Sequence, residues 1–166
     1  MSNQEVNFIP IDMKIVAIVF VLGIVGIISL IVFQVFYYNV ITRLYHAGIR
    51  IAAFIQPKAK LWVAGRKNIF GKIKQEFVRD NSKVVWFHCA SLGEFEQGRP
   101  VMEQLKKEYP NIKIVLSFYS PSGYEVRKNF EGADYVTYLP EDTASNAQQF
   151  IQLIQPDLVV FVKYEF

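Results

Sequence analysis

Residues 84–94 read Val-Val-Trp-Phe-His-Cys-Ala-Ser-Leu-Gly-Glu, and this stretch predicts the fold. The apolar run at 84–87 is typical of a buried strand, and a helical pattern begins at Gly93 and continues to about Tyr109. The residues between them therefore form a strand-to-helix turn. In an open α/β sheet, ligands bind on such turns, at the carboxyl ends of the strands. Glu94, at the start of the helix, is the first candidate for chemistry.

Beyond this turn, apolar runs alternate with helical patterns. Strands are predicted at residues 83–88, 112–118, 135–139 and 158–162, and helices follow the first three. Ser120 before Pro121 is typical of a helix start at 120–130, and Thr143 or Ser145 caps the next helix, which Pro156 ends. Strands that are apolar on both faces predict a parallel sheet with helices on both sides.

The fold class is therefore α/β, a Rossmann-like domain over residues 81–166. A doubly wound sheet usually has about five or six strands, and four are predicted here. We therefore expect this domain to be truncated and the chain to be the N-terminal portion of a longer protein. The sequence contains no GxGxxG motif, so nothing favours a dinucleotide.

The N-terminal part predicts a membrane helix. Residues 15–38 carry no charged side chain, and the run is long enough to cross a bilayer with some tilt. It is longer than the apolar region of a secretory signal, and no small-residue cleavage site ends it. A buried soluble helix is the other, weaker alternative. We expect a tail at 1–14 and one transmembrane helix at 15–38.

Residues 39–80 form a basic segment, with nine Lys and Arg residues against two acidic ones. A basic band beside an apolar end indicates a membrane surface and not nucleic acid. The one predicted span would make the protein single-pass, and the positive-inside rule places its C-terminal side in the cytoplasm. Apolar residues recur at helical spacing up to Pro57, with Arg43, His46 and Arg50 on the opposite face. This predicts an amphipathic helix along the membrane, or, as the alternative, a helix covering the soluble core.

Residues 57–71 are predicted to be a basic connecting loop that binds anionic lipid or is simply solvated. Its Arg66 and Lys67, with Arg43 and Arg50 before it, are candidates for contacts with the membrane or with lipid phosphates. The chain has two histidines and one cysteine, too few to build a zinc site, and we expect no metal. The single cysteine, Cys89, has no neighbouring base, and we interpret it as a small buried residue.

Four motifs, in order, resemble those of one family. The turn at 88–94 resembles a His-Ala-x-Ser-x-Gly-Glu motif, and residues 117–124 resemble a Thr-x-Thr-Pro-Thr-Gly segment. Residues 138–142 resemble a Tyr-Leu-Pro-x-Asp motif, and residues 156–166 resemble the strand before a Glu-Leu-Trp turn. Over about residues 40–166, the chain resembles the N-terminal part of the 3-deoxy-D-manno-octulosonic acid (Kdo) transferases of lipopolysaccharide synthesis.

The resemblance implies a GT-B glycosyltransferase, in which two Rossmann-like domains face each other across a cleft. The N-terminal domain would receive a lipid A precursor, lipid IVA, and a C-terminal domain outside this chain would bind the donor, CMP-Kdo. It implies that the complete enzyme transfers Kdo with inversion, at the inner membrane and without a metal or cofactor. We expect this chain alone to be inactive. Two alternatives stay open: a non-catalytic, membrane-anchored lipid-binding fragment, and another GT-B glycosyltransferase.

The resemblance also assigns roles to residues. Glu94 would be the catalytic base, and a positioned carboxylate can take the proton that an attacking hydroxyl loses. A first-turn carboxylate stabilised by the helix dipole is the structural alternative. The acceptor site would include His88, Ser91, Gly93, Ser120, Ser122, Gly123 and Glu165. Helix capping is the alternative for the serines, and a structural role is the alternative for His88 and for the glycines.

Overall fold

The computed structural model describes residues 13–163 and divides the chain into two compact units. The first unit is Met1–Arg43 and the second is Leu44–Phe166. Helix α1 (Met13–Ala52) is 40 residues long and runs through this boundary. The two units therefore share one element of secondary structure.

The first unit consists, over its described residues, of the apolar part of α1. The side chains at 16–38 are all exposed, and from Val16 onwards the helix is long and apolar enough to cross a membrane, by length and composition. A helix covers residues 15–38, as predicted, and its crossing of a membrane stays a prediction. It continues to Ala52 without a break, so the amphipathic segment after it is not a separate helix.

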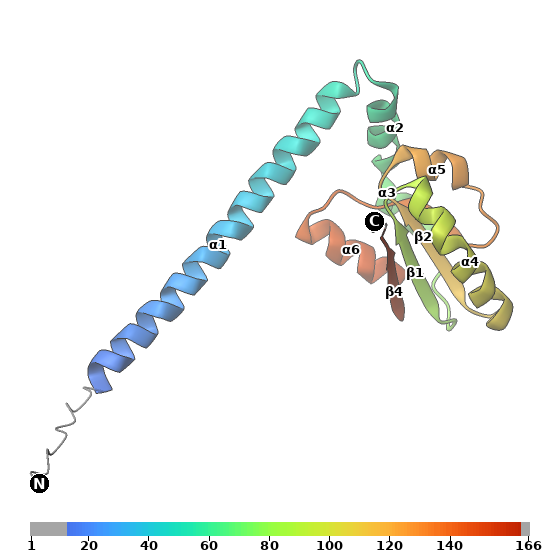
Figure 1. Ribbon diagram of the computed structural model, residues 1–166. Helices are drawn as coiled ribbons and strands as arrows, with labels where there is room; N and C mark the ends of the chain where they lie inside the picture. Colours follow the sequence, from blue (N-terminus) through green and yellow to red (C-terminus); the bar gives the residue numbers. More distant parts are fainter. Residues whose placement is uncertain (1–12, 164–166) are drawn as a thin grey trace, which may run out of the picture. The chain divides into compact units, whose positions relative to one another are not determined.

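The second unit is an α/β domain built on a parallel sheet (Figure 1). The strands are β1 (Val84–Cys89), β2 (Lys113–Phe118), β3 (Tyr135–Tyr138) and β4 (Leu158–Val162). They lie in the order β3-β2-β1-β4, and every pair is parallel, which confirms the predicted α/β class. The strand order reverses at β1, with β2 on one side and β4 on the other. Ligands bind at such a switch point in doubly wound sheets.

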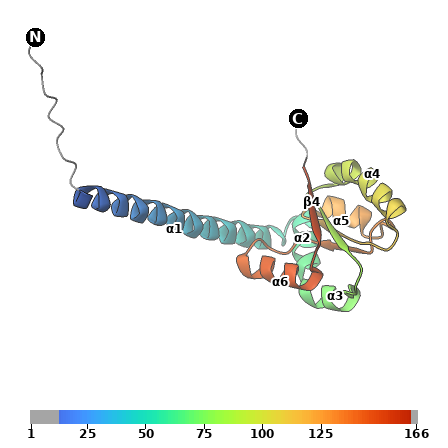
Figure 2. The ribbon, with the colours of Figure 1, turned by 90° about the horizontal axis from the view of Figure 1, so that it is seen from below.

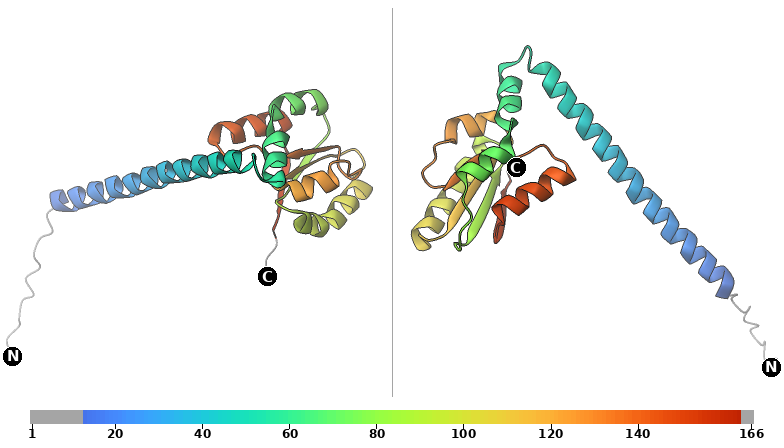
Figure 3. Two further views of the ribbon diagram at one scale, coloured as in Figure 1. Left: turned by 90° about the horizontal axis from the view of Figure 1, so that it is seen from above. Right: turned by 180° about the vertical axis from the view of Figure 1, so that it is seen from behind.

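Helices cover both faces of this sheet, as predicted. They are α2 (Pro57–Arg66), α3 (Ile69–Glu76), α4 (Leu92–Glu108), α5 (Pro121–Arg127) and α6 (Ala144–Ile154). Figure 2 and Figure 3 show α4 and α5 on one face and α3 and α6 on the other. Phe95 and Met102 of α4 fill the core on the first face, and Ile73 and Phe150 fill it on the second. Helix α5 is shorter than predicted, because it ends at Arg127.

The predicted connecting loop at 57–71 is wrong. Helix α2 begins at Pro57, whose fixed φ suits the first turn of a helix, and α3 follows almost directly. Trp62 and Ile69, with Ile73, are buried, so both helices belong to the domain core. Gly65 made this segment resemble a loop, but it serves close packing: a Cβ there would lie 2.1 Å from the ring of Tyr138.

Strand β4 lies at one edge of the described sheet. Two large apolar side chains on it, Leu158 and Phe161, are 54% and 65% exposed. The Phe161 ring nevertheless packs edge-on against Trp86 and against His88, with ring centroids 5.7 Å apart in both pairs. This edge therefore contributes one aromatic side chain to the neighbourhood of β1.

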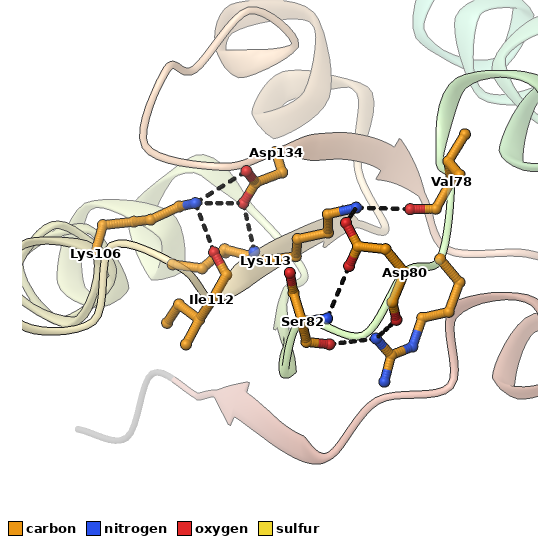
Figure 4. A network of polar contacts seen from close by, with 9 residues as sticks. Val78, Asp80, Ser82, Lys106, Ile112, Lys113 and Asp134 are labelled. Atoms are coloured by element: carbon orange, nitrogen blue, oxygen red, sulfur yellow. Dashed lines mark hydrogen bonds and ion pairs between the residues drawn. The ribbon is translucent and has the colours of Figure 1, made fainter.

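An aspartate before each outer strand fixes the amino ends of the sheet. Asp134, before β3, accepts a hydrogen bond from the backbone N–H of Ile114 at 2.6 Å, and Asp157, before β4, accepts one from the N–H of Val84 at 2.9 Å. Lys106 pairs with Asp134 at 2.7 Å (Figure 4). Each carboxylate therefore ties its own strand to the neighbouring strand, at the end of the sheet opposite the candidate site.

Acid should weaken this end of the domain first. The pKa of Asp80 is lowered by hydrogen bonds from Lys113 and Ser82 (Figure 4), and the pKa of Asp157 by those from Lys83 and Val84. A carboxyl whose pKa is lower in the folded state stabilises the fold above its unfolded pKa of about 4. This stabilisation is lost as the pH falls through the folded pKa. We expect an Asp80→Asn/Asp157→Asn variant to unfold at a lower temperature than wild type at neutral pH, and the difference to disappear in acid.

The measurement is the unfolding midpoint of the protein across a pH series. Glu103→Gln is the matched control, because the partner of Glu103 among residues 13–163 is Arg99 of its own helix, at 3.7 Å. A difference between variant and wild type that stays constant down to low pH would contradict the assignment.

Candidate active site

Three turns meet at the carboxyl edge of the sheet. The turn after β1 is joined to that after β2 by the hydrogen bond from Ser120 N–H to Ala90 O, 2.9 Å, and the N–H of Leu139, after β3, donates to Phe118 O at 2.7 Å. These bonds hold the three loops side by side, so residues far apart in sequence share one surface. The first turn also lies at the point where the strand order reverses.

Glu94 occupies the first turn of α4 and is half-buried. Its Oε2 accepts a hydrogen bond from the backbone N–H of Ala90, while its own N–H donates to Ser91 Oγ at 3.5 Å. Among the described residues, no hydrogen bond engages Oε1. One carboxylate oxygen is therefore fixed by the backbone, and the other is available to a ligand. Glu94 can therefore stabilise the start of α4 and still act as a general base.

Ser91 is the N-cap of α4, as expected, because its side chain accepts from Glu94 N–H. Gly93 is exposed, and a Cβ added there would meet only Ser91 Oγ, at 3.9 Å. The space above Gly93 is open, so packing within the described domain does not require a glycine. Their roles toward an acceptor stay predictions.

His88 is the second-last residue of β1 and is half-buried. Its Nδ1 lies 2.9 Å from Ser117 Oγ. Burial lowers the pKa of His88 and outweighs the opposing influence of Glu94, which raises it. Cys89, the next residue, is fully buried, and burial raises the pKa of its thiol to about 12. This confirms the interpretation of Cys89 as a small buried residue.

The serines after β2 cap their own helix. Ser120 Oγ accepts from Ser122 N–H at 3.2 Å and lies 2.9 Å from Ser122 Oγ. Gly123 is buried, and a Cβ there would lie 2.4 Å from the ring of Phe118. The observed function of Gly123 is therefore the close packing of α5 on β2. Glu165 lies outside the described residues.

The basic residues that were candidates for lipid-phosphate contacts have different environments. Arg66 is only 8% exposed; its guanidinium lies 3.8 Å from the centre of the Trp62 ring and donates to Tyr119 O at 2.9 Å. Burial lowers its pKa to about 10, so it stays charged at neutral pH. Lys67 is exposed at the end of α2, and Arg43 is exposed in the first unit. Arg66 is thus a buried support of the turn after β2 and not a solvated charge.

The end of α1 belongs to the second unit and contacts the loop after β3 there. Arg50 pairs with Glu141, and His46 Nδ1 lies 3.4 Å from the same carboxylate. The His46 ring packs on Trp62, with centroids 5.5 Å apart. Sequence reasoning placed His46 and Arg50 on a polar face but missed their partner Glu141, which lies within the motif at 138–142. The acidic residue in that motif was the available signal.

Comparisons with known proteins match this part of the chain. A sequence model of the family described as 3-deoxy-D-manno-octulosonic-acid transferase (kdotransferase) matches residues 64–166. The chain is 32% identical over 82 residues to the 3-deoxy-D-manno-octulosonic acid transferase of Haemophilus influenzae. It is 30% identical over 102 residues to that of Aquifex aeolicus and 28% identical over 130 residues to that of Chlamydia trachomatis serovar D.

The three alignments cover 49%, 58% and 72% of this chain, but only 19%, 28% and 30% of the relatives. The chain therefore spans less than a third of the length of these curated relatives. No solved structure matches it significantly. All three relatives are glycosyltransferases of one kind. The chain belongs to the 3-deoxy-D-manno-octulosonic acid transferase family, which confirms the resemblance of its motifs.

Proposed function

We propose that this chain is the acceptor-side portion of a membrane-anchored Kdo transferase, with Glu94 as the general base. The observation that carries the proposal is the geometry of Glu94: one oxygen is fixed by Ala90 N–H, at the switch point of a parallel sheet, within the region that matches the family. The domain would be the Rossmann-like N-terminal half of a GT-B enzyme. A C-terminal domain would bind the donor CMP-Kdo across the cleft.

The chemistry requires a base on the acceptor side. A hydroxyl of the lipid A precursor, lipid IVA, attacks the anomeric carbon of Kdo, forms a C–O bond and loses its proton to Glu94. The bond from that carbon to the phosphate oxygen of CMP breaks, and CMP leaves with the electron pair. Attack from the face opposite CMP inverts the anomeric centre. The protein contributes general-base catalysis and the positioning of the two substrates.

The surface around Phe54 supports a membrane partner. Phe54 and Ile55 are 91% and 88% exposed, and Leu44, Ile51 and Leu61 of the same unit are also exposed. Lys58 and Lys60 lie between these apolar side chains in sequence and are exposed too. Exposed apolar side chains with interspersed Lys are typical of a surface at the headgroup boundary. We propose that this surface rests on the cytoplasmic side of the inner membrane.

The two interpretations of the segment after the apolar run can therefore be combined. Its polar face, through His46 and Arg50, packs on the α/β domain, while Leu44 and Ile51 stay exposed. The polar residues of this helix contact the α/β domain, and its exposed apolar residues would contact the membrane.

Spin labels should detect this surface in the intact protein. We expect a nitroxide attached at Phe54→Cys or Ile55→Cys to be more accessible to oxygen, which partitions into lipid, than to a water-soluble paramagnetic agent. Val101→Cys on α4 is the control, since Val101 is apolar and 56% exposed and should show the aqueous pattern. Cys89 should stay unlabelled because it is fully buried. Equal aqueous accessibility at 54, 55 and 101 would contradict membrane contact.

Transfer by the complete protein is the test of function. Its membranes should convert lipid IVA to a product heavier by Kdo only when CMP-Kdo is supplied, as followed by mass spectrometry. The isolated chain should bind lipid IVA without turnover, because the proposal assigns donor binding to another domain. A complete protein that binds lipid IVA but transfers nothing would favour the non-catalytic alternative.

A further inference from the structure

Three polar side chains from β1 and β2 form a hydrogen-bonded chain beneath the candidate site. Trp86 Nε1 donates to Ser117 Oγ at 2.7 Å, and the same oxygen lies 2.9 Å from His88 Nδ1. Ser117 is paired with His88 in the register of the two strands and is fully buried. Ser117 therefore connects a buried indole to a histidine at the edge of the site.

The chemistry of the three side chains determines which atom donates and which accepts in each of these hydrogen bonds. An indole N–H can only donate, so Trp86 occupies one lone pair of the Ser117 oxygen. The hydroxyl proton of Ser117 is buried and needs an acceptor. Among the hydrogen bonds of the described residues, only His88 Nδ1 offers Ser117 Oγ such an acceptor. A His88 that accepts at Nδ1 is neutral and carries its proton on Nε2.

The surroundings of the His88 ring agree with this assignment. Phe161 packs edge-on against both Trp86 and His88, and Phe150 packs on Trp86 with ring centroids 5.0 Å apart. Burial lowers the pKa of His88, and so does the charge of Arg66, while the charge of Glu94 and a hydrogen bond with the backbone of Ser117 raise it. Burial is the largest of these influences, so the neutral ring is favoured.

We propose that Trp86 and Ser117 are positioning residues that hold His88 neutral, with Nε2–H left as a hydrogen-bond donor near the carboxyl end of β1. Nε2 makes no side-chain hydrogen bond with another described residue, so its proton is left for an oxygen of the acceptor. A neutral donor suits an uncharged sugar oxygen, and it leaves the carboxylate as the base. The identity of the group that accepts the hydrogen bond from His88 Nε2–H rests on the proposed function, whereas the tautomer of His88 does not.

The tautomer can be measured in the complete protein labelled with ¹⁵N-histidine. A long-range ¹H–¹⁵N spectrum distinguishes the two neutral tautomers and the imidazolium, and the signals that a His88→Gln variant loses identify those of His88. We expect His88 as the Nε2–H tautomer at neutral pH. Ser117→Ala should give a mixture of tautomers, and Ser117→Thr should restore the wild-type spectrum. An Nδ1–H tautomer or an imidazolium in wild type would overturn the proposal.

Ser117→Ala leaves the buried Trp86 Nε1 unpaired and can destabilise the fold. The Trp86→Phe/Ser117→Ala variant removes both polar groups and provides a second folded test, in which the mixture of tautomers should reappear. If either folded variant keeps the pure Nε2–H form, Ser117 does not position His88.

Kinetics then test the role in the reaction. Ser117→Ala should raise the KM for lipid IVA by about 3- to 10-fold, the equivalent of one neutral hydrogen bond, and change kcat less. Ser117→Thr should restore the KM. An unchanged KM alongside an altered tautomer would overturn the acceptor contact. A wild-type protein without any Kdo transfer would instead defeat the proposed function and leave the tautomer result standing.

Discussion

Glu94→Gln should lower Kdo transfer by the complete protein by about 10²- to 10⁴-fold, the usual effect of losing a general base. Glutamine is nearly the same size and keeps an oxygen that can accept from Ala90 N–H, so the start of α4 should be preserved. What it loses is the ability to take a proton. We therefore expect kcat to fall while lipid IVA still binds, as measured by initial rates at saturating acceptor.

Glu96→Gln is the matched control for this variant. Glu96 lies two residues further along α4, is exposed, and pairs with Arg99 and Arg127. It should retain nearly full activity. A Glu94→Gln protein whose activity stays within tenfold of wild type would show that Glu94 serves the helix and not the reaction.

Phe95→Ala should destabilise the domain by about 3–5 kcal/mol, the cost of removing a large aromatic side chain from a packed core. Phe95 is fully buried, and its ring packs against Phe118 at 5.8 Å and against Phe130 at 5.0 Å. It joins α4 to β2 and to the loop after α5. Because single domains are stable by only about 5–15 kcal/mol, much of the protein should unfold at physiological temperature.

The measurement is denaturant unfolding followed by circular dichroism, with Val101→Ala as the control. Val101 lies on the exposed side of the same helix, so its truncation should change the free energy of unfolding by less than about 0.5 kcal/mol. A loss below about 1 kcal/mol for Phe95→Ala would mean that α4 is not anchored through this residue.

The sheet could be predicted because its signals are local. Apolar runs on both faces define the strands, and Ser120-Pro121 and Thr143 mark helix starts that the structure contains. The helices at 57–76 could not be predicted, because the contacts that stabilise them involve residues distant in sequence. A basic segment with Gly65 and Pro57 is typical of a loop until the ring of Tyr138 and the stacking of Arg66 on Trp62 are known.

The candidate site divides in the same way. Glu94 and its cap Ser91 lie in one turn, so their spacing was sufficient to predict that they act together. Ser117 was missed, although a hydroxyl within an apolar strand was a usable signal. Its partners Trp86 and His88 are about thirty residues away, and only the strand register brings them together.

The exposed edge strand β4 has a consequence for contacts between copies of this domain. Within the described sheet, β4 pairs on one side only, with β1, and it carries exposed apolar side chains such as Leu158 and Phe161, so its outer side can add a strand from a neighbouring chain. During synthesis, such an edge is a template for misassembly between nascent chains.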